Sequence, residues 1–375
     1  MDLRLLDPRQ DLDQIRSVWT SLSAASDHGY FLSWGWIETW LASLPEEVLV
    51  RLAVVSDEGL PVSAFFLGES TVIRHRVLRS RGVFLNATGI PRYDELCIEY
   101  NGMLCSPAIA SRWSELLAIL PDHWEEFVMP GLDASAFPGL CLNQSVDSYR
   151  VLIDKDVPSP YVDLRLVRQR GGDYLSLLHR NTRWQLRNSY RLLEARGPVR
   201  CEVAIDLHSA MAIFDDLVAR HRRTWQRRGQ PGAFASEYVR QFHQQLIRNR
   251  LAHGEIQLLR IAAGDTTIGC LYNFVFKGRV YFYQSGLNYD IDARLHPGLV
   301  SLAEAVTYNA TTGQAIFDFL GGEALYKSRL ATHAGRLVWA TIQKPRLKFR
   351  VEGTLRTFKR QMHQMGCAIV RRGRS

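Results

Sequence analysis

The spacing of apolar and polar residues predicts a chain that mixes helices with strands. In the second half, helices are predicted over residues 173–195, 207–227 and 236–251. Ser236 fits a helix N-cap, and Gly254 lies just beyond the end of the same helix. These start and stop signals separate the helices cleanly from the strands that follow.

The clearest strand signal lies between residues 255 and 284. Three short segments rich in β-branched and aromatic residues are separated by glycine-containing turns, which predicts a three-stranded antiparallel meander. A helix then begins near Pro297, a residue favoured in the first helical turn. A strand over 315–320 follows and ends at Gly321-Gly322.

The first half repeats this order of elements. A helix is predicted over 33–41, strands over 48–55 and 61–67, a helix over 108–120 and a short strand over 126–129. The segment Phe127–Gly131 occupies the same place in this order as Phe317–Gly321, which indicates a diverged duplication. In this alignment the counterpart of Asp318 in the first half is Val128, which has no ionisable group. We therefore expect the second half to carry out the chemistry. The expected fold class is α/β, with a duplicated arrangement of central mixed sheets flanked by helices.

Composition restricts the class of protein further. The chain has 375 residues, of which 46% are hydrophobic and 22% charged, and these values exclude a disordered or fibrous protein. We expect no transmembrane helix and no secretory signal, and therefore a cytoplasmic location. The six cysteines form no C-x-x-C pair and the histidines form no H-E-x-x-H motif, so we expect reduced thiols and no metal.

The net charge of +8 favours anionic partners without choosing among nucleic acid, membrane surface, phosphorylated cofactor and acidic glycan. Arginines recur every three or four residues over 180–191, so that they share one face of the predicted helix. Arg183 and Arg187 on this face, together with Trp225 among the arginines of the next helix, are candidate substrate-binding residues; a solvated face is the alternative. The basic tail over 346–375 has the composition of an interfacial helix for peripheral membrane contact.

Several short motifs occur together in the second half. They are the meander, Asn181-Thr182-Arg183, Arg294-Leu295-His296-Pro297-Gly298-Leu299, Phe317-Asp318-Phe319-Leu320-Gly321-Gly322 and Tyr326-Lys327. In this order they resemble the acyltransferase family named after the bacterial cellulose-biosynthesis protein CelD. That family belongs to the GNAT superfamily and is similar to the Fem-type aminoacyltransferases. The resemblance implies a degenerate GNAT-like half over 1–157, a GNAT-like acyltransferase half over 158–345 and a basic tail over 346–375.

The resemblance also implies a site. The pyrophosphate of acetyl-CoA or another acyl-CoA would rest on the helix start, with Arg294, His296, Gly298 and Leu299 as binding residues. This loop has one displaced glycine where the GNAT pattern has two.

Three residues are candidates for catalysis. Asp318, a carboxylate within an apolar strand, is a candidate base, and an ion pair or a cap of the glycine turn is the alternative. Lys327 would stabilise charge in the transition state, and Tyr283 would protonate the leaving thiolate. Tyr281 and Gln284 would line the channel for the substrate. Because Tyr281 and Tyr283 alternate along the strand, a place in the apolar core is the alternative for both.

Two enzymatic functions and one non-enzymatic function follow from this interpretation. The first is an acyl-CoA-dependent N- or O-acyltransferase that acts on a sugar or glycan precursor, with the machinery of extracellular, cellulose-like polysaccharide biosynthesis as a partner. The second is a Fem-like transferase that takes an amino acid from charged tRNA. The third is a non-catalytic scaffold of a polysaccharide assembly.

Overall fold

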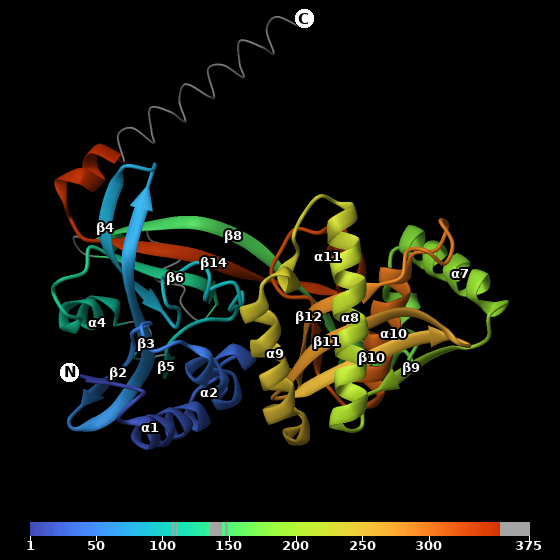
Figure 1. The fold of residues 1–375 in the computed structure, drawn as a ribbon, viewed down its shortest axis with the longest axis horizontal. Helices are drawn as coiled ribbons and strands as arrows, with labels where there is room; N and C mark the ends of the chain where they lie inside the picture. The colour runs from blue at the N-terminus through green and yellow to red at the C-terminus, as the bar shows by residue number, and fades with distance from the viewer. Residues whose placement is uncertain (107–108, 110–111, 136–144, 147–148, 353–375) are drawn as a thin grey trace, which may run out of the picture.

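A computed structural model describes residues 1–106, 109, 112–135, 145–146 and 149–352 of the chain. Its fourteen described strands form one continuous mixed sheet, with helices packed on its faces (Figure 1). This architecture confirms the expected mixed α/β class. The path through the sheet is β1-β2-β3-β4-β6-β14-β8-β13-β12-β11-β10-β9, with β5 paired to β3 and β7 paired to β8.

The first half forms one end of the sheet. Its strands are antiparallel except for β6, which pairs in parallel with β4 after a helical crossover through α4. Its elements are β1 (Asp2–Leu6), α1 (Leu12–Ala25), η1 (Tyr30–Leu32), α2 (Trp34–Ser43), β2 (Val50–Asp57), β3 (Leu60–Arg74), β4 (Leu78–Leu85), β5 (Leu104–Cys105), α4 (Trp113–Ile119), β6 (Glu126–Asp133) and β7 (Ser145–Val146).

The second half forms the other end with the same plan. Here β13 pairs in parallel with β12 after a crossover through α10. The elements are α6 (Leu164–Gln169), η2 (Tyr174–Leu177), α7 (Arg180–Glu194), β9 (Val199–Val203), α8 (Leu207–Arg227), η3 (Ala233–Ala235), α9 (Glu237–Arg250), η4 (Leu251–His253), β10 (Ile256–Ala263), β11 (Thr266–Phe276), β12 (Arg279–Leu287), α10 (Pro297–Thr311), β13 (Ile316–Asp318) and α11 (Leu325–Leu330).

The register of the two parallel pairs is also the same. Phe127 is the middle of three paired residues in β6, and Phe317 is the middle of three in β13. Val128 and Asp318 therefore occupy equivalent positions, as the sequence comparison of the halves predicted.

Two long strands join the halves at the centre of the sheet. Strand β8 (Tyr149–Asp163) follows the first half in sequence but pairs with β13 of the second. Strand β14 (His333–Gln343) follows the second half but pairs with β6 of the first. The two strands also pair with each other along their whole length. The domain boundary expected at 157/158 falls inside β8 and stays a prediction.

An aromatic core also crosses between the halves. Trp36 of α2 packs against Phe242 of α9 and Phe274 of β11, with ring centroids 4.9 and 5.6 Å apart. Helix α2 begins where the sequence predicted, because Ser33 caps it by accepting a hydrogen bond from the Trp36 backbone N–H. Burial of these rings makes the two halves one folded body.

Most predicted elements of the second half are confirmed, with one correction. The helix predicted over 173–195 is interrupted: η2 ends at Leu177, Leu178 is extended and α7 begins only at Arg180. Asp173 caps η2 through the Ser176 backbone N–H, so the chain closes one turn before starting the next helix.

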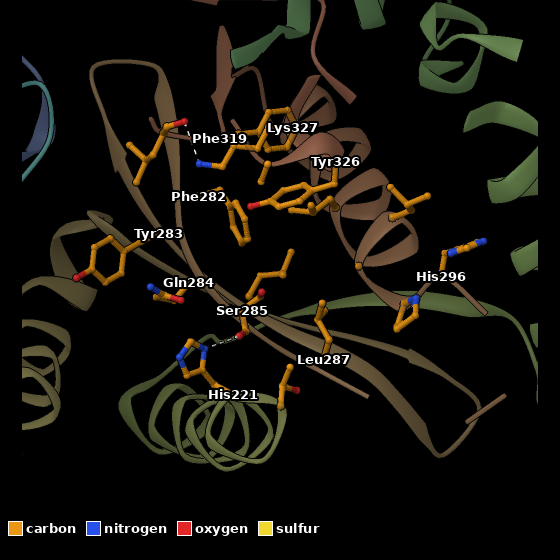
Figure 2. Close-up of a pocket in the computed structure, with 18 of the residues that line it drawn as sticks. His221, Phe282, Tyr283, Gln284, Ser285, Leu287, His296, Phe319, Tyr326 and Lys327 are labelled. Carbon is orange, nitrogen blue, oxygen red and sulfur yellow. Dashed lines mark hydrogen bonds between the residues drawn. The ribbon is translucent and has the colours of Figure 1, made fainter. Parts of the chain in front are cut away.

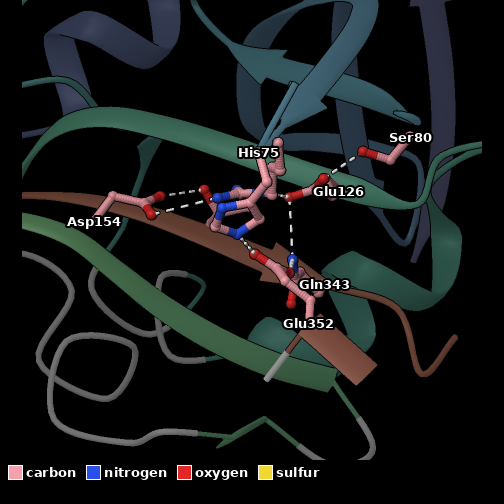
Figure 3. A network of polar contacts seen from close by, with 8 residues as sticks. His75, Ser80, Glu126, Asp154, Gln343 and Glu352 are labelled. Carbon is pink, nitrogen blue, oxygen red and sulfur yellow. Dashed lines mark hydrogen bonds and ion pairs between the residues drawn. The ribbon is translucent and has the colours of Figure 1, made fainter. Parts of the chain in front are cut away.

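The start of the basic tail is anchored to the sheet. Glu352 and Phe349 are buried, and Glu352 hydrogen-bonds Gln343, which also contacts the buried Glu126 (Figure 3). The part of the expected tail over 353–375 lies outside the described residues. Within the described chain, no helix combines the length and the apolar character needed to cross a membrane.

Candidate active site

A cavity opens where strands β12 and β13 separate. They pair only through Arg279–Tyr281 and Ile316–Asp318, and beyond these residues the strands diverge. The resulting cavity has a volume of about 680 Å³, within the range of small-molecule sites. Figure 2 shows the side chains of β12 between His221 of α8 and the pair Tyr326 and Lys327 of α11.

A bulge in β12 shapes one wall. The pairing with β11 shifts register between Tyr272 and Asn273, which leaves Tyr283 as the extra residue. Bulges redirect side chains and are common beside active sites. Tyr283 and Gln284 both line the cavity, and the Tyr283 hydroxyl donates to the Leu96 carbonyl at 3.0 Å.

The start of α10 forms one end of the cavity. His296, Pro297, Gly298 and Leu299 all line it. The first N–H groups of a helix lack intrahelical acceptors, so those of Gly298 and Leu299 are available to an anion, and the helix dipole favours one there. The backbone N–H of His296 is held by the Ser189 hydroxyl of α7 at 3.3 Å, which fixes this turn.

Some predicted residues lie away from the cavity wall. The Arg294 side chain is 71% exposed and pairs with Asp292 at 2.8 Å. Tyr281 is buried in the aromatic core, and neither Arg183 nor Arg187 of α7 lines the cavity. Trp225, by contrast, lies on the wall at the end of α8.

Asp318 is completely buried behind the cavity. It accepts hydrogen bonds from Arg279 at 2.9 Å, from the Tyr100 hydroxyl at 2.5 Å and from the Leu320 backbone N–H at 2.7 Å. It does not line the cavity. The contact with Arg279 is the ion pair that the sequence left open as an alternative. The expected cap of Gly321-Gly322 is not formed by Asp318, which instead accepts from Leu320, the residue just before this turn.

The turn at Leu320 and Gly321 forms the other end of the cavity. Leu320 has φ of 60°, a strained value for a residue with a side chain. The Lys327 ammonium donates to the carbonyls of Leu320 and Gly321, at 3.1 and 2.7 Å. A Glu99 carboxylate oxygen accepts from the Gly321 N–H at 2.6 Å. The Gly321 peptide unit is therefore held from both sides by charged groups that line the cavity.

The electrostatics of these two groups suit proton transfer near neutral pH. Burial raises the pKa of Glu99 to about 7, although the Gly321 N–H and Lys327 oppose the rise. Burial lowers the pKa of Lys327, and Glu99 opposes that shift. A carboxylate with a pKa near 7 is matched to general-base chemistry at physiological pH.

Glu99 carries no signal in the sequence that marks it as a site residue. It lies in the loop between β4 and β5 of the first half, where no motif marked it. His221 was also missed. Burial lowers its pKa, its Nδ1 donates to the Ser285 carbonyl at 3.2 Å, and its buried Nε2 has no hydrogen-bond partner among the described residues. An unpaired buried acceptor on a cavity wall is suited to a polar ligand.

Comparisons with known proteins agree with this geometry. Residues 180–328 match the family described as acetyltransferase (GNAT) domain. No curated protein sequence matches the chain. The crystal structure of FemX is similar, with a TM-score of 0.57 and 10% identity, over 90% of this chain and 97% of that one. A conserved protein of unknown function from Bacteroides thetaiotaomicron VPI-5482 gives a TM-score of 0.53 at 12% identity, over 88% of this chain and 97% of that one.

The cavity is lined largely by the segment that matches the acetyltransferase (GNAT) domain, and this match supports an acyltransferase. The matched segment contains β12, α10 and Lys327, whereas Glu99 lies outside it in the first half. Over 90% of this chain the fold is similar to that of FemX, and the resemblance to the CelD type stays a prediction.

Proposed function

We propose that the protein transfers an acyl group from acyl-CoA to an amine or hydroxyl of a sugar or glycan precursor. The observation that carries this proposal is a single cavity with two functional ends. The N-terminus of α10, with N–H groups available to an anion, lies at one end, and Glu99 and Lys327 lie at the other. The sugar acceptor and a role in extracellular polysaccharide biosynthesis rest on the resemblance to the CelD family.

The donor end suits a phosphorylated thioester. The Gly298 and Leu299 N–H groups would bind the pyrophosphate. Arg228 and Arg329 also line the cavity and supply positive charge for the remaining phosphate. The apolar surfaces of Leu287 and Leu295 fit the uncharged pantetheine arm between the two ends.

The other end suits the transfer itself. Glu99 takes a proton from the acceptor nitrogen or oxygen, which forms the new bond to the acyl carbon while the carbon–sulfur bond breaks and CoA leaves with the electron pair. Lys327 stabilises the negative charge that develops at this end. Asp318 is a positioning residue, because it fixes the Leu320 turn on which both groups converge.

Calorimetric titration with acetyl-CoA and free CoA tests this assignment. We expect micromolar binding in the unaltered chain and at least a tenfold loss in Gly298→Asp. An aspartate in the first turn favours the helix but repels a pyrophosphate. The matched control is Arg294→Ala, which we expect to bind normally because Arg294 is paired away from the cavity. Absence of binding to the unaltered chain would refute the acyl-CoA donor.

A second donor, aminoacyl-tRNA, is supported by one surface feature. Helix α7 exposes Arg180, Arg187 and Arg191 along one side, and Trp184 on the same helix is 66% exposed. Basic groups interleaved with an aromatic ring suit the backbone and bases of RNA. Salt-dependent retardation of tRNA, lost when the three arginines are changed to glutamine, together with no binding of acetyl-CoA, would favour this donor.

A further inference from the structure

The central strands β8 and β14 pass directly beneath the Glu99 end of the cavity. A Cβ built on Gly321 would lie 3.1 Å from Leu337 Cδ1 of β14, 3.3 Å from Val157 Cγ2 of β8 and 3.3 Å from a Glu99 carboxylate oxygen. The side chains of Val157 and Leu337 therefore face the Gly321 turn. We call the face of β8 and β14 that carries Val157 and Leu337 the floor of this end of the cavity, and it continues along both strands.

The next pair on this floor combines a cation with an aromatic ring. Side chains two residues apart in a strand share a face, so Lys155 lies on the same face as Val157, and Trp339 on the same face as Leu337. Lys155 and Trp339 are direct cross-strand partners. The Lys155 ammonium lies 4.2 Å from the centroid of the Trp339 ring.

This pair is available to a ligand. Lys155 is exposed and Trp339 is partly exposed. Within the described ranges, no carboxylate forms an ion pair with Lys155, whereas its neighbour on the strand, Asp156, pairs with Arg336. Lys155 and Trp339 do not themselves line the cavity, but the charge of Lys155 opposes the burial-driven rise in the pKa of Cys97 and Glu99, which do line it.

We propose that Lys155 and Trp339 form the acceptor subsite, and that the acceptor is a sugar carrying a negatively charged group. The ammonium would bind a phosphate or carboxylate as a point charge. The exposed part of the indole, beside the Lys155 ammonium that lies over its ring, would pack on the sugar ring. This inference rests on the proposed function, because the acceptor bound at this subsite would carry the amine or hydroxyl that Glu99 deprotonates.

Fluorine NMR on protein labelled with 5-fluorotryptophan tests the subsite directly. Trp339→Phe and Trp225→Phe identify the two reporter resonances, Trp339 for the floor and Trp225 for the donor cavity. The probes are glucose 6-phosphate and glucuronate, which separate phosphate from carboxylate, with glucose as the neutral counterpart. Acetyl-CoA is titrated in the same samples.

We expect at least one anionic sugar to shift the Trp339 resonance saturably, with at least tenfold weaker binding of glucose. Lys155→Ala should weaken the anionic probe at least tenfold and Lys155→Arg should largely retain it. Equal binding of charged and neutral sugars, no shift with any probe, or unchanged binding in Lys155→Ala would overturn the subsite. A Trp339 response without a Trp225 response to acetyl-CoA would leave the subsite standing and reject acyl-CoA as donor.

Discussion

Replacing Glu99 by glutamine should make the protein more stable at alkaline pH and impair transfer at the same time. The Glu99 side chain is partly buried at the cavity end, where its charged form is poorly solvated. Glutamine has nearly the same shape and retains an oxygen that can accept the hydrogen bond from the Gly321 N–H. The substitution therefore removes the charge while keeping the contact.

The size and pH window of the effect follow from the pKa. Burial raises the pKa of Glu99 from 4.5 to about 7, which corresponds to roughly 3 kcal/mol at ~1.4 kcal/mol per pH unit. Between these two values the folded state holds a proton that the unfolded state has released. The contribution of Glu99 to the free energy of unfolding therefore falls as pH rises from about 4.5 to about 7, and stays low above that.

Urea unfolding at pH 4.5 and pH 8 measures the effect. Glu99→Gln should unfold like the unaltered protein at pH 4.5 and require up to ~3 kcal/mol more at pH 8. Glu95→Gln, an exposed glutamate in the same loop, is the matched control and should change neither value. Acyl transfer by Glu99→Gln should fall by about 10²- to 10⁴-fold, the usual contribution of a general base. A stability difference that does not change with pH would refute the reasoning.

Two further predictions concern other parts of the chain. Asp318→Asn should lower the free energy of unfolding by about 3–5 kcal/mol, because it leaves the partly buried Arg279 without its counterion. Urea unfolding measures this loss. A loss below ~1 kcal/mol would contradict a positioning role for Asp318. Removal of residues 353–375 should reduce flotation of the protein with anionic vesicles while leaving its unfolding unchanged. The truncation is placed after Glu352 because Phe349 and Glu352 are buried. Equal flotation of both forms would exclude a membrane role for the tail.

Local patterns were sufficient to predict much of the second half. Helix α8 runs from Leu207 to Arg227 as predicted, because the glycine-rich segment after it stops the helix. The meander strands are separated by turns with positive φ at Gly264 and Gly278, which only glycine adopts without strain. Such signals are encoded within a few residues and need no knowledge of the tertiary fold.

The parts of the site that the sequence did not predict depend on contacts between residues far apart in the chain. Glu99 meets Gly321 across 222 positions, and no local pattern distinguishes it from Glu95 in the same loop. Asp318 was identified because a carboxylate in an apolar strand is unusual, but its partner Tyr100 lies in the first half. Arg294 was assigned to the donor by its motif, although Asp292, only two residues earlier, is its actual partner.

The long strands β8 and β14 have a mechanical consequence. Each is hydrogen-bonded to the other and to the half of the chain that it does not follow in sequence. The halves therefore have no hinge: swinging one against the other would require breaking a backbone ladder. The loop that carries Glu99 is therefore joined to the Gly321 turn within one body before any substrate arrives, and we expect substrates to be admitted by rearrangement of loops rather than by closure of two lobes.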